Sequence, residues 1–254
     1  MKYSIFILSH QDDEICIFEN IRLALKNKRK IKIFFMTNGY LKKKISKKSL
    51  SERDKESLKV LKKMQVKKKD IIFFGRENNI NSCKLFKNLK FCYDFLLNYL
   101  KDLDGKIELF THAYEGGNED HDACNVIILK ILKNYSKKNI LAFQFSFYNA
   151  DTKLFPYKVQ KPLKINGKLL KINVKFSHRF QYLKYLFEYK SQFKVWIGLY
   201  PFVIFNLLFK NYYFLQKINK NFKLIKPHKG LLLYEKFRNS KFEELKYFFL
   251  KFLN

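Results

Sequence analysis

Residues 3–14, YSIFILSHQDDE, join an apolar segment directly to a histidine and a run of acids. An apolar run of six residues that ends in polar residues is typical of a buried β-strand followed by a turn. The apolar residues after Glu14 recur at helical spacing. We therefore expect a strand over 3–8 and a helix over 15–27, with the polar cluster at the turn between them.

The same alternation continues through residues 1–150. Further strands are expected over 31–36, 71–74, 107–110 and 140–145, and further helices over 51–64, 85–100 and 122–132. Ser51 is a candidate N-cap, with Asp54 completing a capping box. This alternation predicts an α/β fold, a Rossmann-like, mostly parallel sheet with helices on both faces.

Residues 151–254 have a different pattern. The stretch 151–175 is rich in Lys and contains Pro156 and Pro162, which favours hairpins or loops. From residue 176 onward the pattern is mainly helical and rich in aromatic residues. We expect 1–150 to form the core and 151–254 to form a C-terminal extension packed on the same domain.

The formal net charge is +30, from 52 Lys and Arg against 22 Asp and Glu. Such a balance suggests a nucleic-acid or anionic-membrane partner. However, only six of the basic residues are Arg, and the Lys residues are spread along the whole chain. Because phosphate and base recognition favours Arg, compositional bias is the preferred interpretation, and no specific nucleic-acid partner is expected.

Residues 195–209 form the longest uncharged stretch. Fifteen residues fall short of the roughly 18–20 that span a bilayer, and Pro201 interrupts them, so we expect a partly helical segment that does not cross a membrane. It is either buried or lies on a surface as a peripheral membrane contact. Trp196 and the Phe- and Tyr-rich tail from Tyr182 to Phe252 are expected to pack in the core rather than to form a sugar-stacking platform. The four cysteines show no paired spacing, which favours a reducing, cytoplasmic location.

Two polar clusters follow predicted strands. The first is His10-Gln11-Asp12-Asp13-Glu14, and the second is THAYEGGNEDHD at 111–122. The acids could simply complement the positive ends of helix dipoles, but that reading does not explain the histidines. Since both clusters follow strands of a parallel sheet, His10, Asp13 and His121 can meet at one edge. Three N and O ligands with an open position are typical of catalytic zinc, and Asp12 beside them can accept a proton from water.

These segments resemble the PIG-L/LmbE-like N-acetylglucosamine deacetylases. SHQDDE is similar to that family's first motif, and THAYEGGNEDHD to its second, usually THxxEGGHPDHD. Further matches occur in the same order along the chain: Thr37-Asn38-Gly39, Arg53 with Glu56, Phe74-Gly75, and Tyr189-Lys190-Ser191-Gln192.

The resemblance implies a zinc-dependent hydrolase that removes an N-acetyl group from an amino sugar or sugar conjugate. His10, Asp13 and His121 match the zinc ligands, Asp12 matches the general base, and Arg53 matches a substrate contact. The substrate would be a small molecule or glycan that carries an acetylated amine.

Three positions depart from the family pattern. Asn118 replaces a His that is thought to stabilise the oxyanion and to help protonate the leaving amine, and Glu119 replaces Pro. His112 could take over that His's role if the loop folds back. Asn78 stands where relatives often have an Asp that recognises the sugar. The chain could therefore instead be a catalytically impaired relative that acts as a glycan-binding module, or a basic nucleic-acid or membrane-surface binding protein.

Overall fold

The computed structural model describes residues 1–42, 49–135, 139–153, 156–238 and 240–254, with the side chain of Val195 excepted. Its centre is a seven-stranded sheet in the order β3-β2-β1-β4-β5-β9-β8. The strands are β1 (Lys2–Leu8), β2 (Lys30–Phe35), β3 (Ile71–Ile72), β4 (Lys106–His112), β5 (Ile140–Phe145), β8 (Leu169–Asn173) and β9 (Tyr212–Lys217). The first five in this order run parallel, whereas β9 is antiparallel to both β5 and β8. The predicted α/β fold with a mostly parallel sheet is confirmed.

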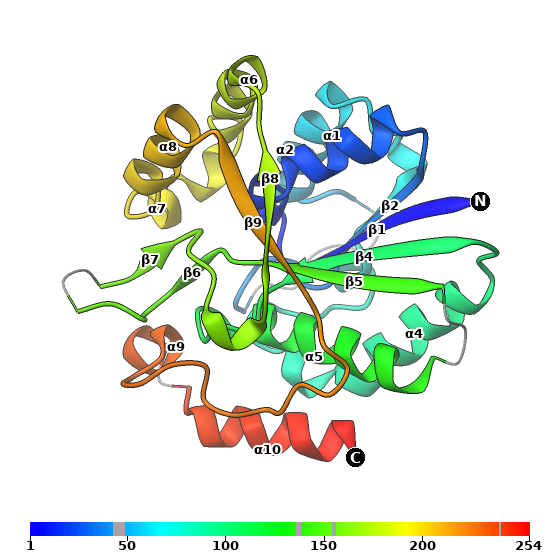
Figure 1. The fold of residues 1–254 in the computed structure, drawn as a ribbon, viewed down its shortest axis with the longest axis vertical. Helices are drawn as coiled ribbons and strands as arrows, with labels where there is room; N and C mark the ends of the chain where they lie inside the picture. Colours follow the sequence, from blue (N-terminus) through cyan, green and yellow to red (C-terminus); the bar gives the residue numbers. More distant parts are fainter. Residues whose placement is uncertain (43–48, 136–138, 154–155, 239) are drawn as a thin grey trace.

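Helices cover both faces of the sheet (Figure 1). One face carries α1 (Phe18–Lys26) and α2 (Glu52–Lys63), and the other carries α4 (Leu89–Lys101), α5 (Glu119–Asn134) and α10 (Phe242–Leu253). Alternate residues of β1 enter opposite cores: Ile5 and Ile7 pack with the α4/α5 layer, while Phe6 and Leu8 pack with the α1/α2 layer. This period of two is what a strand that is buried on both faces requires.

Several boundaries differ from those expected. The expected helix over 15–27 is a 3-10 turn (Asp13–Cys16) followed by α1, and the one over 85–100 is a 3-10 turn (Leu85–Lys87) followed by α4. The strand expected over 71–74 stops at Ile72, because α3 (Phe74–Glu77) packs its Gly75 directly against the backbone of Thr37, where a Cβ would lie 2.1 Å away. At α2 the expected capping box of Ser51 and Asp54 is confirmed.

The C-terminal extension is mainly helical, as expected, and it also adds β8 and β9 to the sheet. Its helices are α6 (Phe176–Leu186), α7 (Phe193–Trp196), α8 (Tyr200–Phe209), α9 (Leu233–Phe237) and α10, with 3-10 turns at Lys164–Asn166 and Lys190–Gln192. A separate two-stranded sheet pairs β6 (Tyr148–Asn149) with β7 (Lys158–Val159), and one more 3-10 turn covers Lys68–Asp70. Residues 195–209 are partly helical, as predicted. Among the described residues no helix has both the length and the apolar character needed to cross a membrane.

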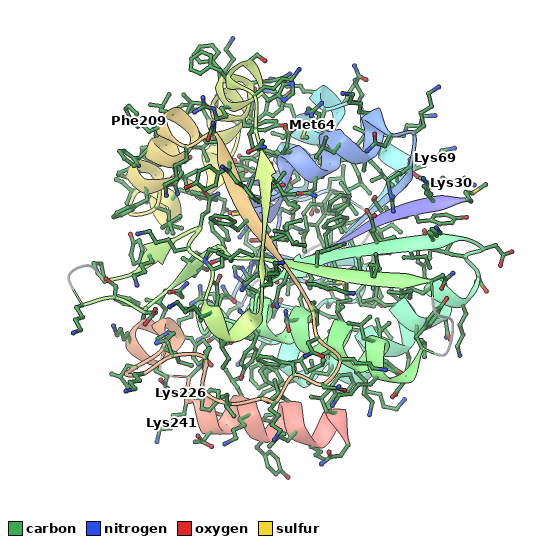
Figure 2. The ribbon with its side chains drawn as sticks, viewed as in Figure 1. Lys30, Met64, Lys69, Phe209, Lys226 and Lys241 are labelled. Atoms are coloured by element: carbon green, nitrogen blue, oxygen red, sulfur yellow. The ribbon has the colours of Figure 1, made fainter. Side chains whose placement is uncertain are left out.

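The basic side chains project from many sides of the molecule. Lys30 and Lys69 lie at the edge near the N-terminus, whereas Lys226 and Lys241 lie near α10 at another edge (Figure 2). This dispersal is consistent with the charge being spread over the surface rather than gathered on one face.

Candidate metal centre and cavity

The two polar clusters meet because β1 and β4 are neighbouring parallel strands. Ile7 lies opposite Thr111 in the register, so the segments that follow both strands leave the sheet at the same edge. The second segment then enters α5, which carries His121 in its first turn. One ligand atom from each of His10, Asp13 and His121 lies within 4.8 Å of the other two, and all three residues are buried. Their predicted convergence is confirmed.

The residues present suit a metal ion. His121 is 1% exposed, and within the described part of the chain neither of its ring nitrogens has a hydrogen-bond partner. Burial lowers the pKa of His121 to about 3, so its imidazole is neutral and a lone pair is free. Burial alone would raise the pKa of Asp13, but the imidazoles of His112, His121 and His10 hold it well below its ordinary range. A neutral imidazole beside an ionised carboxylate is the donor set that zinc binds.

The imidazole ring of His10 is held in place by contacts at Nε2, the nitrogen that faces away from Asp13. Its Nδ1 lies 3.5 Å from Asp13 Oδ2, whereas its Nε2 lies 2.9 Å from Asp120 Oδ2 and 3.0 Å from Ser82 Oγ. Asp120 in turn accepts hydrogen bonds from the backbone N–H groups of Cys83 and Leu85. Burial would lower the pKa of His10, but the two carboxylates raise it to about 9. At that pKa the ring carries a proton at neutral pH, so His10 would release a proton on binding a metal ion. A carboxylate behind a ligating imidazole then fixes the ring and its tautomer.

His112 is not among the residues that line the cavity of this site. It is the last residue of β4, is 0% exposed, and stacks on His121 with ring centroids 3.8 Å apart. Its Nε2 lies 3.0 Å from Asp13 Oδ2. This position suits a residue that holds Asp13 and His121 in place rather than one that delivers a proton to substrate.

Asp12 lies beside the three residues in a strained conformation. Its φ is 119°, in the region that non-glycine residues rarely adopt, and such strain persists only where surrounding contacts impose it. Arg53 Nη2 donates to Asp12 Oδ1 (3.1 Å), and Trp196 Nε1 donates to Asp12 Oδ2 (2.8 Å). Burial raises the pKa of Asp12 to about 6, with Arg53 opposing the rise. Asp12 is therefore ionised at neutral pH and basic enough to accept a proton.

The guanidinium of Arg53 donates its hydrogen bonds to groups of the protein itself. Besides Asp12 it donates to the carbonyl groups of Gln11 (2.7 Å) and Gly39 (2.5 Å). Gly39 has a φ of 75°, and a Cβ there would lie 2.9 Å from the guanidinium, so glycine at this turn allows the close approach. Arg53 thus positions Asp12 while still lining the cavity.

A cavity of about 890 Å³ opens above the cluster, and its lining includes His10, Asp12, Asp13, Arg53, Ser82, Asn118, His121, Tyr148, Trp196, Phe237 and Arg238. Its walls come from both the 1–150 core and the C-terminal extension, since Trp196 and Arg238 belong to the extension. Asn78 is not among the lining residues; it is exposed and donates to the carbonyl of Phe74 (2.9 Å). The structure therefore does not bring Asn78 to the other candidate residues.

Asn118 is the N-cap of α5. Its Oδ1 accepts from the Asp120 N–H (2.9 Å), which leaves its Nδ2 toward the cavity, where it donates to the Tyr148 hydroxyl (3.3 Å). Burial raises the pKa of Tyr148, so this hydroxyl stays protonated at neutral pH. Glu119, the second departure from the family pattern, accepts hydrogen bonds from Arg238 (3.0 Å) and Ser240 (2.7 Å) and so ties the C-terminal segment to the cavity rim.

Sequence reasoning missed five residues around the site: Ser82, Asp120, Tyr148, Trp196 and Arg238. Asp120 lay inside the second motif and could have been noted as a carboxylate next to a candidate ligand. The other four carry no local signal. Trp196 is buried, as expected, but the structure also places its N–H against Asp12, 184 positions away in the chain.

The fold has known counterparts. The structure is similar to the zinc-inhibited form of teicoplanin deacetylase Orf2, with a TM-score of 0.60, 15% identity, and 85% of this chain and 97% of that chain covered. It is also similar to the A40926 pseudoaglycone deacetylase Dbv21, with a TM-score of 0.60, 14% identity, and coverages of 87% and 98%. For the N,N'-diacetylchitobiose deacetylase from Pyrococcus horikoshii the TM-score is 0.56, with 17% identity and coverages of 89% and 87%. At these identities the likeness establishes the fold.

A comparison with curated protein sequences found no match. A family model does match the sequence itself. It is the model described as PIG-L, GlcNAc-PI de-N-acetylase, and it covers residues 5–132, half of the chain and both polar motifs. The chain therefore belongs to the PIG-L family of de-N-acetylases, to which the LmbE-like deacetylases also belong.

Proposed function

We propose that this protein is a zinc-dependent hydrolase that removes the N-acetyl group from an amino sugar or a sugar conjugate. The observation that carries the proposal is the convergence of His10, Asp13 and His121 beside the ionised Asp12 in one cavity. Family membership supports this substrate class. So do two similar structures, a deacetylase in complex with teicoplanin and a deacetylase of N,N'-diacetylchitobiose, which favour an acetylated sugar or glycopeptide.

His10, Asp13 and His121 would hold the zinc ion. Zinc at such a site lowers the pKa of a bound water to about 7 and polarises a carbonyl group. Asp12 would accept the proton of the attacking water and later return it to the leaving amine. It suits both steps because its pKa of about 6 lies close to neutrality and because Arg53 and Trp196 fix its two oxygens.

The oxyanion that develops on the amide carbonyl needs a donor in the cavity. Asn118 Nδ2 and the Tyr148 hydroxyl lie on the cavity side of the cluster and can both donate. Removing one such donor typically costs about 2.7–4 kcal/mol of transition-state stabilisation. With Asn118 as donor and Asp12 as proton carrier, the reaction does not need a His at position 118.

The test is release of acetate from a panel of N-acetylated amino sugars, oligosaccharides and glycopeptides, measured with the zinc-loaded protein and again after chelation. We expect release that depends on zinc and is lost in Asp12→Asn. Zinc uptake and sugar binding without any release would contradict the proposal and support the glycan-binding module instead.

We also propose that residues 151–254 belong to the same folding unit as the 1–150 core, since β9 completes the central sheet beside β5. A cytoplasmic location is part of the proposal, and it is supported by the four cysteines, which are all unpaired.

A further inference from the structure

Helix α8 has an unusual surface. Its sequence YPFVIFNLLF contains no charged residue, yet Phe205, Leu208 and Phe209 are 54%, 38% and 71% exposed. These three residues are spaced by three and four positions and so share one side of the helix, and the rings of Phe205 and Phe209 lie 4.9 Å apart. A helix on the surface of a water-soluble domain normally turns charged residues outward. Phe209 lies at the end of α8 (Figure 2).

Helix α6 extends this apolar surface. Phe176, Phe180 and Phe187 are 66%, 49% and 54% exposed and recur at helical spacing. Arg179 joins the two helices, since its guanidinium lies over the Phe176 ring (5.2 Å) and donates to the carbonyl of Leu208 (2.8 Å). Eight of the nineteen exposed large hydrophobic side chains of the described residues lie between 176 and 209. We call this surface, formed by α6, α7 and α8, the aromatic face.

The aromatic face reaches the cavity. Phe193 and Ile197, which are 54% and 63% exposed, continue it along and just beyond α7. Phe187 and Phe193 both contact Tyr200. Tyr200 stacks on Trp196, whose N–H donates to Asp12 inside the cavity. In Figure 1, α6, α7 and α8 gather in one corner of the molecule.

Basic residues surround the aromatic face. Between positions 175 and 210 the chain has six basic residues and one acid; the basic residues are Lys175, Arg179, Lys184, Lys190, Lys194 and Lys210. The single acid, Glu188, is paired with Lys59 and Lys63. Acids of other elements also contact these segments, since Glu56 accepts hydrogen bonds from Ser191 and Glu19 lies 3.3 Å from His178. The face therefore combines exposed aromatic rings with an excess of basic over acidic side chains.

We propose that the aromatic face docks on an anionic lipid bilayer, with its phenylalanine rings at the boundary between headgroups and acyl chains and its lysines on the headgroups. Apolar insertion together with lysine attraction to anionic lipids is the combination that holds interfacial helices at membranes. A second copy of this chain is a poorer occupant, because it would bring the same positive charge against this one. A nucleic acid would complement the positive charge of the face but would leave its exposed phenylalanine rings in contact with water. Docking would place the cavity mouth beside the membrane surface.

The experiment is co-sedimentation of the purified full chain with sucrose-loaded vesicles, either of phosphatidylcholine alone or of phosphatidylcholine mixed with phosphatidylglycerol. We expect strong binding to the anionic vesicles and weaker binding to the neutral ones. Phe205→Ser/Phe209→Ser should lower the partition coefficient roughly tenfold per ring removed, because the apolar surface that each ring would bury in the bilayer is lost. The matched control is Phe91→Ser on α4, which removes a ring of similar exposure, 50%, away from α8 (Figure 1).

A second pair of variants tests the charge without altering the apolar side chains. Lys190→Glu/Lys194→Glu should weaken binding to anionic vesicles, whereas Lys30→Glu/Lys69→Glu, on the other side of the molecule from Phe209, should not (Figure 2). The proposal is overturned if the wild-type chain does not sediment with anionic vesicles at low salt, if the face and control variants bind alike, or if the face variants abolish only self-association. Binding is measured without substrate, so failure here is distinguishable from failure of the proposed hydrolase activity.

Discussion

Replacing Asp12 with asparagine turns one carboxylate oxygen into an NH₂ group, although both oxygens of Asp12 accept hydrogen bonds. Arg53 Nη2 donates to Oδ1 and Trp196 Nε1 donates to Oδ2, at 3.1 and 2.8 Å. Asparagine has the same shape but only one accepting oxygen. Whichever way the amide is turned, its NH₂ group faces one of these two donors, so one hydrogen bond is replaced by a contact between donors.

The magnitudes follow from this geometry. A side chain that is positioned to accept a proton typically contributes about 10²–10⁴-fold to the rate. Asp12→Asn should lose that factor. The unsatisfied donor should cost about 1–3 kcal/mol of folding stability, partly offset because a charged group is no longer buried. Zinc content should stay at the wild-type level, because His10, Asp13 and His121 are untouched.

The assay combines acetate release, zinc content and thermal unfolding on the same preparations. Trp196→Phe is the matched control, since it removes the donor to Oδ2 while leaving the carboxylate in place. It should lose less activity than Asp12→Asn, because the proton acceptor remains although one of its oxygens is no longer held. Trp196→Phe also removes buried volume and so costs stability by itself. In the double variant Asp12→Asn/Trp196→Phe the contact between donors can be relieved, so its loss of stability should be smaller than the sum of the two single losses, while the rate stays low.

Two results would refute this reasoning. Wild-type turnover in Asp12→Asn would show that Asp12 does not carry the proton. Loss of zinc from Asp12→Asn, with the fold intact, would show that Asp12 is a metal ligand rather than a base.

Three further predictions follow from the site. His121→Ala and His10→Ala should each lose zinc, measured as metal per chain, and a variant that retained a full equivalent would exclude that residue as a ligand. Asn118→Ala should slow acetate release with little change in zinc content, and it should lower stability by about 1 kcal/mol through loss of the α5 cap. Asn118→His should be tolerated. An unchanged rate in Asn118→Ala would show that Asn118 does not take part in the reaction. Chelation should lower the unfolding temperature, since a ligand at 100 times its Kd stabilises the folded state by about 2.7 kcal/mol; an identical melting curve with and without zinc would argue against a metal bound to the folded protein.

The outline of the fold could be predicted because its signals are local. The strand over 3–8 is a short apolar run that ends in polar residues, and in the structure its alternate residues face two different cores. Boundaries such as the end of β3 could not be predicted, because they depend on contacts such as that between Gly75 and Thr37, which come from separate segments.

The candidate metal site was also predictable from sequence. His10 and Asp13 follow one strand and His121 follows another, and the parallel alternation brings the carboxyl ends of such strands to one edge. Topology alone thus predicted the meeting of these three residues. Topology could not decide where His112 lies, and this residue proved to be buried against Asp13. Nor could it decide the place of Asn78, which proved to lie outside the cavity.

The sequence by itself determined the α/β alternation, the family and the three residues that converge, because each is carried by a periodic pattern or a contiguous motif. Only the tertiary structure decided which residues surround them. Trp196 reaches Asp12, and Arg238 reaches Glu119, across 184 and 119 positions of chain. The physical reason is that side chains so far apart in sequence meet only when the whole core has packed, and no local pattern of hydrophobicity or charge records which of them will share a cavity.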